Sequence, residues 1–98
     1  QGVSKSQSVT INKKCGEITM DGAALAANTT VSFTLTNSTI AATDLLALNH
    51  AGVGTAGAYL LNAQCAAGSA TINVRNVTSG SLSEAITIRF AVIKAVIA

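Results

Sequence analysis

The chain has no proline and no tryptophan, and only 3% of its 98 residues are aromatic: Phe33, Tyr59 and Phe90. Charged residues are also scarce, at 10% against roughly 25% in an ordinary domain. A core with so few rings must be built from Val, Ile, Leu and Ala, which bury less apolar area per side chain. A small core and a weakly charged surface together indicate an assembly in which partners cover part of the domain.

These shortages exclude several classes of function. The six cations are scattered along the chain, so no basic, aromatic-rich surface for nucleic acid is expected. No apolar run approaches the roughly 18 residues of a membrane span, so no membrane insertion is expected. Since the sequence begins at Gln1 rather than Met, we expect a fragment of a longer protein.

Groups that carry chemistry are few. Cys15 and Cys65 form no CxxC motif and are expected to be reduced and largely buried, with neither zinc nor redox chemistry. His50 is the single histidine, and the four acidic residues are far apart in sequence. The sequence therefore predicts no catalytic residues, no metal site and no cofactor, and a protein that is not an enzyme.

Alternation of apolar and polar residues is the dominant pattern, and a period of two is typical of half-buried β-strands. The longest such stretches are residues 30–37, 69–77 and 85–93. In the last of them the expected inward row is Ile86, Ile88, Phe90 and Val92. Shorter strands are predicted at 8–12, 17–20, 44–49 and 58–64, with a hairpin turn at 13–16 and a helical turn at 23–28.

About seven strands with regular turn signals predict an all-β domain, an antiparallel β-sandwich of the jelly-roll-like kind, with an Ig-like sandwich as the alternative. Residues 8–98 are expected to form this single domain, and the polar residues 1–7 a flexible N-terminal segment. The last strand turns apolar on both faces, which predicts burial on both faces, either by the domain itself or by a neighbouring subunit. The candidate interface residues are Ala91, Ile93 and Val96.

Binding residues are expected in loops, because loops on a rigid scaffold commonly carry function. The favoured loop is 50–57, and residues 21–28 and 79–83 are the other candidates. The candidate binding residues are His50, Gly52, Thr55 and Tyr59. Three Asn-x-Ser/Thr sequences, at Asn28, Asn37 and Asn76, are interpreted as chance matches in a chain rich in Asn and Thr.

Four segments carry a family resemblance: Gly54–Tyr59 (GTAGAY), Ala67–Ser69 (AGS), Asn76–Ala85 (NVTSGSLSEA) and Ile88–Lys94 (IRFAVIK). Over residues 8–95 the chain resembles the C-terminal β-module of tailed-bacteriophage virion proteins, of the kind that closes tail fibres and head-decoration proteins. The resemblance implies a homotrimer on the virion surface, assembled in the host cytoplasm, which contacts other virion proteins and a host-surface glycan or protein. It implies no catalytic residues.

The expected function is therefore a non-enzymatic virion surface module that presents loops for host-surface binding, fastens to the particle, or does both. Two alternatives remain open. One is a capsid decoration or cement domain without a receptor role, and the other is a bacterial Ig-like adhesin module.

Overall fold

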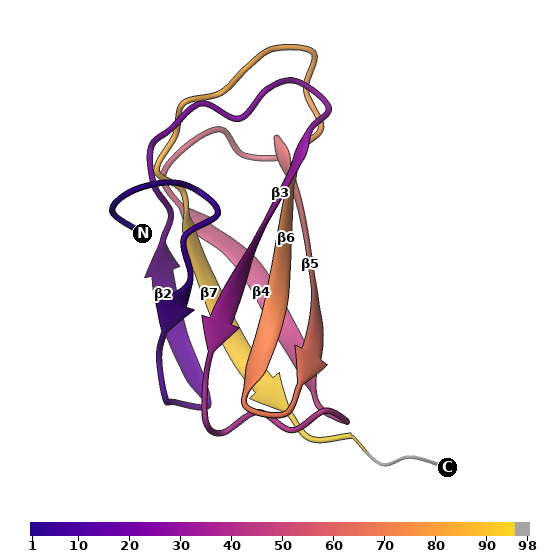
Figure 1. Cartoon of the computed structure of the whole chain (residues 1–98). Coiled ribbons are helices and arrows are strands. Elements are labelled where there is room, and N and C mark those ends of the chain that lie inside the picture. The colour runs from indigo at the N-terminus through magenta and orange to yellow at the C-terminus, as the bar shows by residue number, and fades with distance from the viewer. Residues whose placement is uncertain (96–98) are drawn as a thin grey trace.

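The computed structural model describes residues 1–95, and this part of the chain contains seven β-strands and no helix (Figure 1). The strands form two sheets. Sheet A has the order β1-β3-β6-β5 and sheet B the order β2-β7-β4. Their bounds are Val9–Thr10 (β1), Cys15–Thr19 (β2), Thr30–Thr36 (β3), Leu45–Gly52 (β4), Tyr59–Ala66 (β5), Ser69–Asn76 (β6) and Thr87–Ile93 (β7). All pairs are antiparallel except β1 with β3.

The core lies between the sheets and follows from the alternation along each strand. In β7, Ile88 and Phe90 are buried while Arg89 is exposed, as the alternation predicts. The other large buried side chains come from both sheets and from the segments that follow β2, β3 and β6: Ile18, Met20, Leu25, Phe33, Leu35, Ile40, Ile72, Val74 and Ile86. Gly16 faces Phe90 across the β2–β7 pair, and a Cβ at Gly16 would lie 3.0 Å from the Phe90 ring. A side chain at position 16 would therefore require the Phe90 ring to move by a few tenths of an ångström.

Two local predictions are wrong because strand pairing is decided by distant partners. Residues 13–16 are not a hairpin turn: β1 lies in sheet A and β2 in sheet B, and Cys15 and Gly16 already belong to β2. Residues 23–28 form no helical turn, since Leu25 makes a β-bridge with Leu82. Of the connections between described strands, β5–β6 is a hairpin within one sheet, and each of the others crosses from one sheet to the other.

The predicted burial of the last strand on both faces is not provided by the domain itself. The inner face of β7 packs in the core, but its outer face is open, with Ala91 half-buried and Ile93 44% exposed. Cover of this outer face by a neighbouring subunit, the other alternative, stays a prediction. The third candidate interface residue, Val96, lies outside the described residues.

Two asparagines at opposite ends of the domain stabilise the turns at the ends of β3 and β6 by hydrogen bonds. Asn37 and Asn76 are completely buried, and each accepts hydrogen bonds from the amide and the hydroxyl of the threonine two residues later, at 2.6–3.0 Å. The Asn76 amide group also donates to the Leu25 and Gly80 carbonyls, both at 2.9 Å. Two of the three Asn-x-Ser/Thr sequences are therefore turn-forming motifs with a structural role, and the interpretation as chance matches missed this.

Candidate functional site

Three loops meet at one end of the domain, and we call this the loop end: residues 20–29 between β2 and β3, 53–58 between β4 and β5, and 77–86 between β6 and β7 (Figure 1). They lie together because the strands before them run in the same direction. Loops 20–29 and 77–86 are joined by the backbone pair Leu25–Leu82, with N–O distances of 2.8 and 3.0 Å. Loop 53–58 is joined to residue 77 by a 2.9 Å bond from the Val77 amide to the Ala58 carbonyl. All three loops that the sequence favours for binding therefore share one end.

The side chain of Glu84 connects two of the loops at this end through hydrogen bonds. Its Oε1 accepts hydrogen bonds from the Thr55 amide (3.0 Å) and the Tyr59 hydroxyl (2.7 Å), and its Oε2 accepts one from the Thr55 hydroxyl (2.9 Å). The bond from Tyr59 and those from Thr55 stabilise the carboxylate and lower the pKa of Glu84. Partial burial, together with the bond to Glu84, raises the pKa of Tyr59 above its usual range. One carboxylate thus ties loop 53–58 to loop 77–86.

Lys5 holds the N-terminal segment against the same end. Its side chain is only 5% exposed, and its Nζ donates to the carbonyls of Glu84 (2.6 Å) and Asp21. Burial lowers the pKa of Lys5, and the nearby carboxylates of Asp21 and Glu84 oppose that shift. The segment also bonds the domain through Gln1, whose side chain accepts from the Asp21 amide. The polar sequence of residues 1–7 did not predict these contacts.

His50 lies near the C-terminal end of β4. It lies in the inward row of that strand beside Ile88, and its ring meets Tyr59 edge-on with centroids 5.4 Å apart. Its Nε2 contacts the Val53 carbonyl at 2.8 Å, across the turn that follows the strand. The histidine therefore packs at the rim of the core and supports the turn with a hydrogen bond.

The turn itself is strained and exposed. Val53 has φ 55°, a left-handed conformation that β-branched residues rarely adopt, and its side chain is 61% exposed. Gly54 follows with φ 89°, and a Cβ there would lie 2.8 Å from Ile86 and 2.9 Å from the Glu84 carboxylate. Only glycine fits at position 54, because the backbone lies directly against these two side chains.

The structure thus brings three of the four candidate binding residues together at the loop end. His50, Thr55 and Tyr59 lie around Glu84, whereas Gly52 ends β4 and its carbonyl accepts a bond from the Thr87 hydroxyl (2.9 Å). Sequence reasoning missed Lys5 and Glu84, since a lone Lys and a lone Glu 79 positions apart carry no local signal.

Other chemistry is sparse in the described part of the chain. Within residues 1–95, no group of three His, Cys, Asp or Glu side chains is placed to hold a metal ion. Nor does any helix in that range have the length and apolarity to cross a membrane. Both cysteines are free, but the prediction that they are largely buried is wrong for Cys15, which is exposed on β2. Cys65 is half-buried, and this burial raises the pKa of its thiol.

Comparison with known proteins adds no relative. No family model matches the chain, and no curated protein or solved structure gives a significant match.

Proposed function

We propose that this domain is a non-enzymatic recognition module that uses its loop end to contact the surface of a bacterial host. The observation that carries the proposal is the Glu84 network, which links two loops through three side-chain hydrogen bonds. A loop held before binding loses less conformational entropy when it binds, and preorganisation of this kind increases affinity. The exposed Val53 at the tip adds an apolar contact to a largely polar end.

The setting that we propose is the virion surface of a tailed phage, and its support is the sequence resemblance of residues 8–95. A homotrimer is the assembly that this resemblance implies. For the finer fold we propose the jelly-roll-like class. The division into four and three strands equals that of a constant-type Ig domain, but the first two Ig strands share a sheet, whereas β1 and β2 lie in different sheets.

Binding of the labelled domain to a panel of purified bacterial surface polysaccharides and intact bacterial cells tests the recognition role. The panel contains lipopolysaccharides, capsular polysaccharides and teichoic acids. The informative variant is Ala56→Arg, which alters the exposed loop tip without removing a partner of Glu84. Its control is Gln64→Arg, with the same change of charge on the exposed face of sheet A.

We expect saturable binding to at least one member of the panel, reduced about tenfold or more by Ala56→Arg and unchanged by Gln64→Arg. Equal losses in the two variants would place the contact away from the loop end. Absence of binding to the whole panel would contradict host recognition and favour a decoration domain that fastens to the particle.

A further inference from the structure

The outer face of sheet B contains an uncharged patch that the domain leaves open. Successive strand partners place Leu45 beside Ile93, and in the next row Cys15, Ala91 and Ala47 lie side by side across β2, β7 and β4. Leu45 and Ile93 are 47% and 44% exposed, and Cys15 and Ala47 are exposed as well. We call these five residues the sheet B patch.

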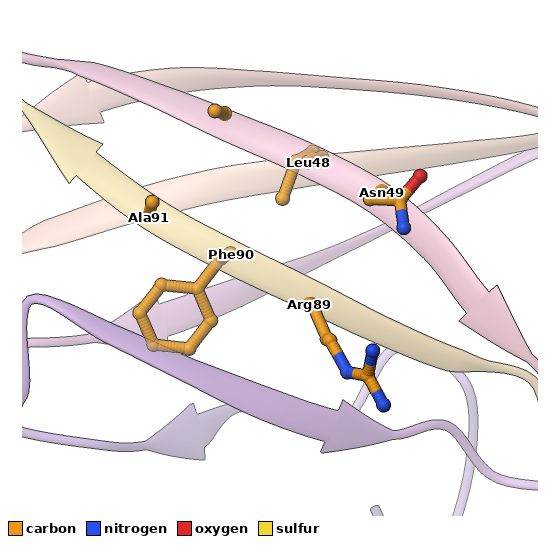
Figure 2. Close-up of a pocket in the computed structure, with 6 residues that line it drawn as sticks. Leu48, Asn49, Arg89, Phe90 and Ala91 are labelled. Carbon is orange, nitrogen blue, oxygen red and sulfur yellow. The ribbon is translucent and has the colours of Figure 1, made fainter.

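The patch has a raised row next to a hollow one. A shallow recess of about 220 Å³ is lined by Ala47, Leu48, Asn49, Arg89, Phe90 and Ala91. Ala47 and Ala91 are its small outward side chains, and Figure 2 shows Asn49 and Arg89 in the next row of the same two strands. Leu45 and Ile93 form the adjacent ridge, since they occupy the next outward positions of the same two strands. A second copy packed face to face, related by a two-fold axis that runs parallel to the sheet and across its strands, would place its ridge in this recess and receive the first ridge in its own. The surface therefore has the self-complementary shape that an interface between identical chains requires.

The charges beside the patch also fit a second copy. The neighbouring row carries Glu17 and Arg89, which form an ion pair at 2.9 Å, and ends in the uncharged Asn49. Because this row has one charge of each sign, it adds no net charge beside the patch and does not repel a second copy. A strongly acidic or basic partner would gain little from such a row.

The outer face of sheet A differs in a way that makes it a useful control. Its residues are mainly Thr, Ser, Asn and Gln, and some of them bond to one another across the strands. The Ser32 hydroxyl donates to Asn73 (2.6 Å), which in turn donates to Asn62 (2.7 Å). The one large exposed apolar side chain in a strand of this face, Leu60 (55% exposed), stands opposite Arg75, whereas the sheet B patch places two large apolar side chains side by side next to three small uncharged ones.

The geometry points to the sheet B patch as the surface through which copies of this chain associate. A two-fold contact gives a dimer rather than the homotrimer that the sequence resemblance implies, so this inference is independent of that trimer and of host recognition at the loop end. It also includes two of the three candidate interface residues, Ala91 and Ile93.

Sedimentation velocity from about 1 to 200 µM tests the inference, because self-association depends on concentration. The informative variant is Ala91→Arg, which fills the recess, and Gln64→Arg on sheet A is its charge-matched control. We expect the native chain and Gln64→Arg to be oligomeric, and Ala91→Arg to raise the dissociation constant about tenfold or more. Far-UV circular dichroism at low concentration checks that both variants are folded.

Alkylation of Cys15 provides a second measurement that does not rely on the arginine variant. In a Cys65→Ser background, the rate of reaction with N-ethylmaleimide should fall as the protein concentration rises, because association covers the thiol. An oligomer that survives Ala91→Arg and leaves Cys15 equally reactive would overturn the patch and leave the proposed homotrimer to form through another surface. A native monomer at about 200 µM would overturn both.

Discussion

At the scale of single residues, the buried Asn76 shows how the sequence stabilises its loop end. Asn76 makes four side-chain hydrogen bonds, as a donor to two carbonyls and as an acceptor from the amide and hydroxyl of Thr78. Each donated bond closes a different loop, because Leu25 follows β2 and Gly80 follows β6. A buried amide with both functions occupied is costly to replace, since any substitute leaves polar groups without partners.

Asn76→Asp should therefore destabilise the domain strongly. The carboxylate keeps an acceptor for Thr78 but loses both donated bonds and places negative charge against two carbonyl oxygens. We expect a loss of about 2–4 kcal/mol in the free energy of unfolding, measured by urea denaturation. Asn28→Asp is the matched control, because Asn28 stands in the same Asn-x-Thr pattern but is exposed. Equal midpoints for the two variants would contradict the structural role of Asn76.

A second residue-scale prediction separates backbone conformation from steric contact at two glycines of one loop. Gly54 and Gly57 both have positive φ, at 89° and 78°, but only Gly54 has other side chains where a Cβ would lie. Gly57→Ala should cost about 1–2 kcal/mol through its left-handed backbone alone. Gly54→Ala should cost about 1–3 kcal/mol more, because its methyl group meets Ile86 and Glu84. Thermal or urea melts compare them, and a smaller loss at Gly54 would show that the loop is not packed against Glu84.

At the scale of strands, most of the fold was predictable because alternation is a local property. The inward rows of β3, β6 and β7 follow directly from their period of two, and the candidates at 44–49 and 58–64 became the longer strands β4 and β5. The partner of each strand was not predictable in the same way. Lys13 and Lys14 connect a strand of sheet A to a strand of sheet B, and they do not form a hairpin turn. Leu25 pairs with Leu82, which lies 57 positions away in the sequence.

Strand β7 gives the most direct test of register. Phe90 is 3% exposed and packs on Gly16, whereas the Arg89 side chain is 66% exposed on the opposite face. Phe90→Ala should lower the free energy of unfolding by about 3–5 kcal/mol, from lost burial and the remaining cavity. Arg89→Ala should cost less than about 1 kcal/mol, because it removes an exposed ion pair with Glu17. Denaturant melts of the two variants at low concentration check this, and the reverse order would mean that the faces of β7 are exchanged.

At the scale of the whole molecule, loops that are distant in sequence form one surface. The sequence singled out three loops separately, and their position at one end follows from strand directions that only the paired sheets define. The link through Glu84 and Lys5 was not predictable, since it joins residues from opposite ends of the chain. The domain thus has two distinct surfaces available for contact: the loop end and the open outer face of sheet B.

Hydrogen exchange at the Thr55 amide tests most directly whether the bond to Glu84 holds the loop end together in the free domain. This amide donates to Glu84 rather than to a neighbouring strand, so its protection reports on that link. We expect exchange about tenfold or more slower than in an unstructured peptide. Glu84→Ala should remove this protection and leave the amides of β6 unchanged. Glu17→Ala, which removes an equal charge from sheet B, should have no effect at Thr55. Exchange of the native Thr55 amide at the unstructured rate would contradict a preformed loop end.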